Sequence, residues 1–296
     1  MFYIITSIFF VVWAVLIIKK IDMSLHSIIS IYVVTVFLVD WGDVFFYKWV
    51  NFYDIPAKIF RNIDVGNYLG IMFSDGIIFP ASAIIFCYYS IRYRRPWLLS
   101  ILFSSMFGVI EFIFRKYGFM VYHHWNSFAT PIITFISLLI LSRFSYRFVN
   151  YYPPVSYKFR IMCFIYTIGE WPGGITAATL HLYLFRPHVF TDETADSRLV
   201  GMITTTLLSV ITAIIIDKIH PKYRIVLFAG LGICYSIFAF WLYSKGYMIY
   251  NHWNHMLTVI RYLVPFIVVY FYDKWESSYS NKLHLKAAIN DKNGKC

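Results

Sequence analysis

The residues of this chain best placed to do chemistry are acids and one arginine that interrupt long apolar stretches. They are Asp40, Asp43, Asp75, Glu111, Glu170 and Arg261. When two carboxyl groups lie close together, each disfavours ionisation of the other, which suits one of them to hold and transfer a proton. We therefore take Asp75 and Glu111 as the candidate catalytic pair. Asp40, Asp75, Glu111, Glu170 and Arg261 are the candidate residues of a substrate-binding pocket.

These side chains also have a structural alternative. An ionised group costs about 2.5–3.5 kcal/mol at the centre of a membrane helix, so it usually faces the interior of a bundle and finds a partner there. Arg261 is expected to offset one or two of the carboxylates, and a pair with Asp75 or Glu111 would only hold helices together. All six residues fall at mid-depth or towards one side of their apolar stretches. That common depth predicts a polar pocket open to one side.

A second group of polar residues occurs in two similar segments, GFMVYHHWN at 118–126 and GYMIYNHWN at 246–254. His124, His252 and His255 are candidate metal ligands, because imidazole is the commonest metal-binding side chain. No H-E-x-x-H motif and no carboxylate at ligand spacing accompanies them. The alternative assigns the segments a structural role, with aromatic anchors and helix caps at an interface. Its residues are Trp125, Asn126, Trp253 and Asn254.

The elements that must position these residues are membrane helices. The chain has 296 residues, of which 59% are hydrophobic and 14% charged, so it is more apolar than one soluble core can hide. Its apolar stretches are continuous and of membrane-spanning length, which predicts helices and excludes a strand barrel. We expect nine spans, at about 2–18, 25–47, 67–90, 97–114, 126–143, 158–182, 199–216, 223–243 and 254–272.

The net charge of +11 is explained by the position of the basic residues. If the N-terminus lies outside, 17 of the 26 lysines and arginines fall in loops on the inner side and 8 in loops on the outer side, with Arg261 within a span. Cytoplasmic loops carry such an excess, so we predict a multi-pass cell-membrane protein with its N-terminus outside and its C-terminus in the cytoplasm. The charge does not predict a nucleic-acid partner.

The two similar segments predict an internal duplication, because six of their nine positions are identical. An even number of helices in each unit would insert both copies the same way up. The expected fold is all-α: a polytopic transmembrane bundle of about nine helices, with two parallel four-helix repeats plus one N-terminal helix. The expected units are a leading helix at 1–24, four-helix units at 25–150 and 151–275, and a polar, disordered cytoplasmic tail at 276–296.

The first unit resembles a known family. It contains VDWGDVFFYKWV, YDIPAKIFRN, FSDGIIFPASAIIFCYY and FGVIEFIFRKYGFMVYHHWN in that order. This order is similar to that of function-unassigned four-helix integral membrane proteins of bacilli and clostridia, which share an acid-Trp pair, a D-x-x-x-F-P span and a Trp-Asn corner. The resemblance covers about 120 residues and implies a fold and a membrane location, without a reaction. The matching positions are Asp40, Trp41, Asp75, Phe79, Pro80, Glu111, Trp125 and Asn126. The second unit has Thr205 or Thr206 in place of Asp75, and Ala239 in place of Glu111.

Two classes of function follow from the sequence. The first is a non-enzymatic carrier, or a structural or assembly component of the membrane, with an outward-facing polar pocket. The second is an intramembrane enzyme that acts on a lipid or isoprenoid with paired carboxylates. The expected partners are the lipid bilayer and a small solute or lipid, with no cofactor, and the sequence does not determine the oligomeric state.

Overall fold

The protein is built almost entirely from helices. The computed structural model describes residues 2–21, 23–59, 61, 63–150 and 155–293. The long helices of this part of the chain are α1 (Phe2–Ile21), α2 (Leu25–Asp43), α3 (Ile63–Phe73), α4 (Phe79–Tyr93), α5 (Pro96–Lys116), α6 (Ala129–Val149), α7 (Tyr157–Gly174), α8 (Glu193–Ile215), α9 (Arg224–Ser244) and α10 (His255–Asn293). The short strands are β1 (Tyr53–Asp54), β2 (Val121–Tyr122), β3 (Tyr183–Phe185) and β4 (Met248–Tyr250).

Three π-helical turns extend or join these helices, and two of them occur at similar places. Val44–Trp49 continues α2 and Ile175–Thr179 continues α7, while Ser74–Ile78 joins α3 to α4. Short 3-10 helices at Ile216–Lys218 and Pro221–Tyr223 form the connection from α8 to α9. A π-helical turn rotates the residues that follow it relative to the helix before it, and such turns are frequent at functional sites.

The length and composition of the helices suit a membrane. Eight helices in the described residues are long and apolar enough to cross a bilayer. The ten α-helices give eight such spans because α3 and α4 form one continuous span over Val65–Tyr93, and because α7, in the span expected at 158–182, is not among the eight. Helix α7 has 18 residues and lies beside α2, α8 and α10. The all-α polytopic bundle that the sequence predicts is therefore confirmed.

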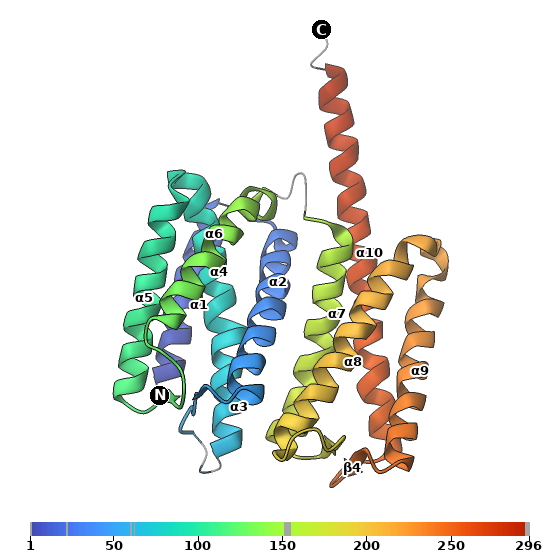
Figure 1. Ribbon diagram of the computed structural model, residues 1–296. Helices are drawn as coiled ribbons and strands as arrows, with labels where there is room; N and C mark the ends of the chain where they lie inside the picture. Colours follow the sequence, from blue (N-terminus) through green and yellow to red (C-terminus); the bar gives the residue numbers. More distant parts are fainter. Residues whose placement is uncertain (1, 22, 60, 62, 151–154, 294–296) are drawn as a thin grey trace.

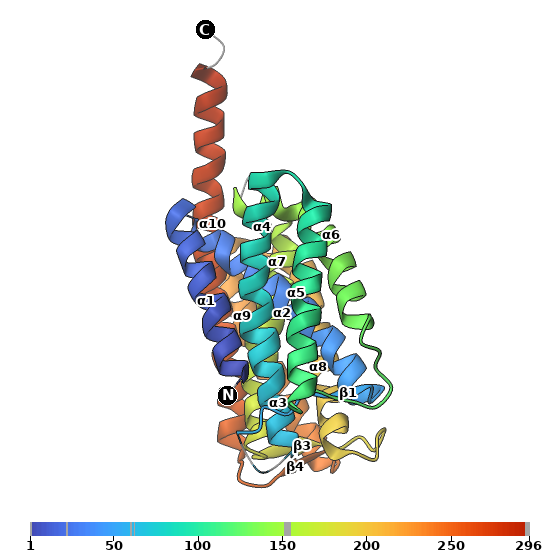
Figure 2. The ribbon, with the colours of Figure 1, turned by 90° about the vertical axis from the view of Figure 1, so that its left-hand side faces the viewer.

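The helices form two groups that lie side by side, as Figure 1 shows. We call α1–α6 the first half and α7–α10 the second half. Helices α2 and α7 pack against each other where the two groups meet. The strands of both halves lie at one end of the bundle, and α10 projects from the other end (Figure 2). We call the end that carries the strands the strand end.

Each half contains one antiparallel strand pair with a similar set of hydrogen bonds. In the first half β1 pairs with β2, and the backbone N–H groups of His123 and His124 donate to the carbonyl oxygen of Phe52. In the second half β3 pairs with β4, and the N–H groups of Asn251 and His252 donate to the carbonyl oxygen of Leu182. The similar segments 118–126 and 246–254 thus form similar corners at the same end of the molecule.

The glycine that begins each corner has a backbone conformation that side chains disfavour. Gly118 has a φ of 69° and Gly246 a φ of 76°. Glycine adopts such left-handed angles at little cost because it has no Cβ. The following N–H group, of Phe119 or Tyr247, then donates back to a carbonyl of the preceding helix. This local turn explains why glycine occurs at the first position of both segments.

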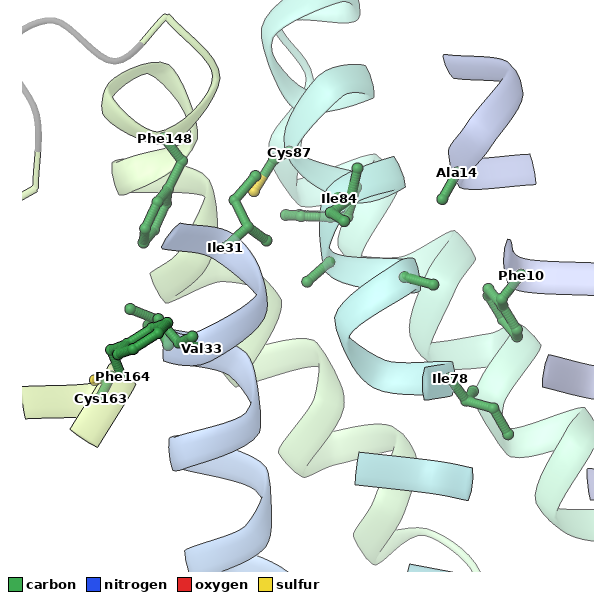
Figure 3. Packing of buried hydrophobic residues seen from close by; sticks show 14 of the residues in the cluster. Phe10, Ala14, Ile31, Val33, Ile78, Ile84, Cys87, Phe148, Cys163 and Phe164 are labelled. Atoms are coloured by element: carbon green, nitrogen blue, oxygen red, sulfur yellow. The ribbon is translucent and has the colours of Figure 1, made fainter. Parts of the chain in front are cut away.

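Apolar packing joins the leading helix α1 to the first half and joins the two halves to each other. Figure 3 shows Phe10 and Ala14 of α1 in the same cluster as Ile78 and Ile84. The same view shows Val33 of α2 next to Phe164 of α7. In lipid, close packing of this kind is a main contribution to helix association.

Two sequence expectations about helix ends were wrong. The span expected at 199–216 begins earlier, at Glu193, because the side chain of Asp192 accepts a hydrogen bond from the N–H group of Thr194 and caps α8. The tail expected to be disordered continues α10 as far as Asn293. Each residue added to a helix that is already formed gains one hydrogen bond. The polar residues after the apolar span therefore continue its helix. The expected unit boundary at 150/151 borders residues 151–154, which lie outside the described residues, as do 294–296.

Candidate functional site

A buried arginine connects the two halves. Nη2 of Arg198, in α8, lies 2.9 Å from Oδ1 of Asp40 in α2, and Nη1 lies 2.7 Å from Oε1 of Glu170 in α7. The hydroxyl group of Tyr166 donates to the other oxygen of Asp40, and that of Thr205 donates to Oε2 of Glu170 at 3.3 Å. The three charged side chains are 94% or more buried. We call Asp40, Glu170 and Arg198 the interface triad.

Arg261 lies beside this triad and not beside Asp75 or Glu111. Its guanidinium group donates to the carbonyl oxygen of Gly169 and, at 3.4 Å, to the hydroxyl group of Tyr183. It also faces Gly173, where an added Cβ would overlap the guanidinium group. A small cavity of about 30 Å³ lies between Arg261, Arg198 and Glu170. The proximity of Arg261 to Glu170 therefore partly offsets the charge of this buried acid.

A much larger cavity lies inside the first half. Its volume is about 320 Å³, and residues of α1, α2, α4, α5 and α6 form its wall. Most of the wall is apolar, including Val34, Ile78, Phe107, Leu138 and Leu141. Ligand cavities in proteins have volumes of about 300–1,000 Å³ and mostly apolar walls with a few polar groups. The cavity is therefore large enough for part of a small molecule.

The acidic groups of the cavity wall come from positions near the strand end of their helices. Asp43, the last residue of α2, faces the cavity, and Oδ1 of this carboxylate accepts a hydrogen bond of 2.9 Å from the hydroxyl group of Tyr53. Asp75 is fully buried next to Asp43, and its Oδ1 accepts a hydrogen bond of 2.8 Å from Ser74. Asp43 and Asp75 thus form a carboxyl pair that joins α2 to the start of α4.

Glu111 also faces this cavity, from α5. Its side chain is 6% exposed, and its Oε1 accepts a hydrogen bond from the hydroxyl group of Tyr122 in β2. Thr130 and Trp125, which are further polar neighbours of this carboxyl group, line the same cavity. Strand pairing holds Tyr122 opposite Tyr53, so the partner of Glu111 and the partner of Asp43 come from paired strands.

The cavity reaches the outer surface of the helix bundle between α2 and α6. Leu38 of α2 and Ile133 of α6 both line the cavity, and they are 58% and 41% exposed. Exposed apolar side chains on a membrane helix face lipid. The apolar wall of the cavity is therefore continuous with the apolar outer surface of the bundle at these two residues.

The acidic residues that the sequence singled out belong to two separate groups. Asp40 and Glu170 belong to the interface triad, and Asp75 and Glu111 belong to the first half. Asp75 contacts Ser74 and Asp43, while Glu111 contacts Tyr122, so each has its own partners. Glu170 lies close to both Asp40 and Arg261, while Arg261 donates its hydrogen bonds to Gly169 and Tyr183, so the five residues expected in one pocket do not form a single cluster.

Sequence reasoning missed Arg198, which it placed in an outer loop. The stretch ETADSR is polar and reads as a loop, but it forms the first turns of α8. Asp196 in the same turns is fully buried and accepts hydrogen bonds from the N–H groups of His188, Val189 and Phe190. A signal was present in the sequence, because Asp192 is a good helix cap and is followed by Glu193 in the first turn.

The Trp-Asn corners have structural contacts in both halves. The indole N–H group of Trp125 donates to Thr130, and that of Trp253 donates to Thr258. The side chain of Asn254 accepts a hydrogen bond from the N–H group of Leu257 and caps α10. Asn126 accepts one from the N–H group of Phe128 just before α6. Asn254 thus caps its helix as expected, whereas α6 begins at Ala129 without a side-chain cap from Asn126.

The candidate metal ligands have neighbours of other kinds. His255 packs against the rings of Phe240, Tyr243 and Tyr250. His124 and His252 donate backbone N–H groups to the strand carbonyls of their own corners. Over the ranges that the structure describes, no group of three or more His, Cys, Asp or Glu side chains is arranged to hold a metal ion.

Comparison of this chain with protein-family models, with curated proteins and with solved structures found no match. The class of protein is therefore defined by the fold and the cavities alone. The chain is a multi-pass helical membrane protein with a small polar cavity in its second half and a larger, mostly apolar cavity in its first half.

Proposed function

We propose that the first half binds the apolar part of an amphiphile taken up from the bilayer, and that the protein acts as a non-enzymatic lipid carrier or lipid-binding component. The observation that carries this proposal is the 320 Å³ cavity, whose apolar wall reaches the surface at Leu38 and Ile133 and whose two acids, Asp43 and Glu111, lie towards one end. An apolar chain with one polar head group matches such a wall, because the chain packs against apolar side chains and the head group meets polar ones.

We also propose that the protein belongs to a bacterial cell membrane, with its N-terminus outside and its C-terminus in the cytoplasm. The lysine and arginine distribution supports this orientation, and α10 carries the C-terminal polar residues out of the bundle at the end opposite the strands. On this orientation the strand end, and with it the polar end of the cavity, faces the outside.

We further propose that the two halves arose by duplication of a four-helix unit related to the function-unassigned family of bacilli and clostridia. Contacts between the halves support this proposal because they occur in matching pairs. Trp41 of the first half donates its indole N–H group to Thr206 of the second half at 3.2 Å. Trp171 of the second half packs over Gly76 of the first half. Trp41 and Trp171 follow the acids Asp40 and Glu170, which both bind Arg198.

The cavity can be tested by filling it. Gly42 lines the cavity, and an added Cβ at this position meets no atom within 4 Å, so Gly42→Phe should place its ring in the cavity without a clash. We expect a diazirine-labelled dodecanol in phosphatidylcholine nanodiscs to crosslink to α2, α4, α5 and α6 of the wild type. The ring would take the space of the bound chain and remove its packing contacts, so labelling of Gly42→Phe should fall at least about tenfold, which corresponds to about 1.4 kcal/mol.

Gly230→Phe is the matched control for this experiment. Gly230 lies in α9 of the second half, where an added Cβ also meets nothing within 4 Å, and it does not line the cavity. Its labelling should equal that of the wild type. Equal labelling of α2, α4, α5 and α6 in the wild type and in Gly42→Phe would show that the probe binds the lipid-facing surface and would refute the proposal.

A second candidate function is an intramembrane enzyme that acts on a lipid or isoprenoid. It is favoured by the contact between the carboxyl groups of Asp43 and Asp75 at the polar end of the cavity, because paired carboxyl groups can share and transfer a proton. Mass spectrometry of the extracted lipids, before and after incubation with the wild type and with Asp75→Asn, distinguishes the two. Conversion by the wild type alone would favour the enzyme over the carrier.

A further inference from the structure

The polar end of the large cavity holds acids without a paired cation. Asp43 and Glu111 line the cavity. Asp75 does not line it but contacts Asp43. Within the described residues no lysine or arginine forms an ion pair with any of these three. The neighbouring Arg115 is exposed, stacks on the ring of Tyr122 at 4.7 Å and donates to Ser127, so it lies outside the cavity wall.

Two carboxyl oxygens at this end also have no hydrogen-bond partner in the described part of the chain. They are Oε2 of Glu111 and Oδ2 of Asp75, whose side chains are 6% and 0% exposed. A buried polar atom without a partner costs free energy, and a buried charge without one costs more. Such atoms are rare in folded proteins and call for a ligand, an ion or a proton. Because Glu111 lines the cavity, a ligand in the cavity can supply the missing donor.

Aromatic rings surround the same acids. Phe46, Tyr53 and Trp125 line the cavity, and the ring of Trp125 lies 5.1 Å from each of the other two rings. The face of an aromatic ring attracts a cation, and this attraction grows when water is excluded. Rings and carboxylates around one space, next to an apolar wall, favour an organic cation over a hydrated metal ion, which would need six or more oxygen ligands.

On the basis of the proposed amphiphile site, we propose that the head group it selects is a protonated primary amine attached to an apolar chain. An ammonium group carries three N–H donors, which suit the partnerless oxygen of Glu111 and the carboxylate of Asp43. The chain extends from these acids along the apolar wall towards Leu138 and Leu141. Entry from the bilayer at Leu38 and Ile133 keeps that chain in apolar surroundings throughout.

Competition between matched amphiphiles tests this inference. Labelling by the diazirine-bearing dodecanol is measured in phosphatidylcholine nanodiscs with dodecylamine, dodecanol or dodecanoate added at equal mole fractions of the bilayer. A hydrogen bond to a charged group is about twice as strong as one between neutral groups. We therefore expect dodecylamine to displace the probe at a mole fraction about tenfold lower than dodecanol, and dodecanoate to be the weakest competitor.

Two variants test whether the acids cause the preference for the amine over the alcohol. Glu111→Gln and Asp43→Asn each remove a charge and keep an oxygen that accepts the hydrogen bond from Tyr122 or Tyr53. Each should reduce the ratio of amine to alcohol affinity about tenfold and leave displacement by dodecanol within about twofold of the wild type. Gly230→Phe should keep the wild-type ratio.

The outcomes separate this inference from the proposed function. Equal displacement by amine and alcohol in the wild type, or an amine preference that persists in both variants, overturns the inference and leaves the amphiphile site in place. Absence of any labelling of the cavity wall in the wild type overturns both. If either variant fails to fold, the ranking of the three competitors on the wild type decides the question.

Discussion

Replacement of Arg198 by methionine is expected to lower the free energy of unfolding by about 3–5 kcal/mol, the usual cost of removing one member of a buried ion pair. The arginine is the only residue that joins the carboxylates of Asp40 and Glu170 by ion pairs in the described structure. Its loss leaves two acids together in a water-excluded interface, where each disfavours the charge of the other. The change is best measured by steric trapping in bicelles, which reports unfolding of the membrane-embedded protein.

The triple variant Arg198→Met, Asp40→Asn, Glu170→Gln shows whether charge is the cause. The amide oxygens of Asn and Gln can still accept the hydrogen bonds from Tyr166 and Thr205, so the triple variant should recover most of the lost stability. Lys245→Met is a control, because Lys245 is exposed in the turn between α9 and β4. Wild-type stability in Arg198→Met would show that the triad does not hold the halves together.

The second large effect is expected at Gly76, where the first half contacts Trp171 of the second half. An added Cβ at Gly76 would overlap the ring of Trp171. Gly76→Ala should therefore destabilise the protein by about 1–3 kcal/mol, the usual cost of overpacking a tight interface. In an open helical position the same change would be neutral or stabilising, because glycine is a poor helix former. The sign of the effect thus reports the contact between the halves.

A double-mutant cycle isolates that contact. In Gly76→Ala with Trp171→Ala, the added methyl group has space, so the cost of the alanine at position 76 should largely vanish. Gly230→Ala is the matched control, since a Cβ there meets nothing within 4 Å. If Gly76→Ala costs the same with and without Trp171, the strain does not come from this interface, and the packing of the π-helical turn Ser74–Ile78 against Trp171 must be revised.

The number and placement of the helices follow largely from the sequence. Hydrophobic stretches of the required length determine where the chain crosses the membrane, because a helix rises 1.5 Å per residue and satisfies its own backbone. Local signals likewise explain the corners, where glycine takes a positive φ and asparagine caps α10. The start of α8 was missed because its first turns are polar, and polar turns resemble loops when hydropathy is the guide.

Hydropathy and local sequence signals could not predict which charged residues contact each other. Arg198 and Asp40 are separated by 158 positions, and they meet because α2 and α8 present those faces to the junction of the halves. Hydropathy gives the length of a helix but not its rotation about its own axis, so it does not tell which buried acid faces which base. For the same reason the sequence assigned Arg261 to Asp75 or Glu111, whereas the structure places it beside Glu170.

The sequence by itself thus determined a helical membrane protein with polar groups in its apolar stretches, because composition, stretch length and local turns depend on neighbours along the chain. Only the tertiary structure separated those polar groups into an interface triad and an acid-lined cavity. That separation depends on how helices distant in sequence pack against one another, and on the space that their side chains leave unfilled.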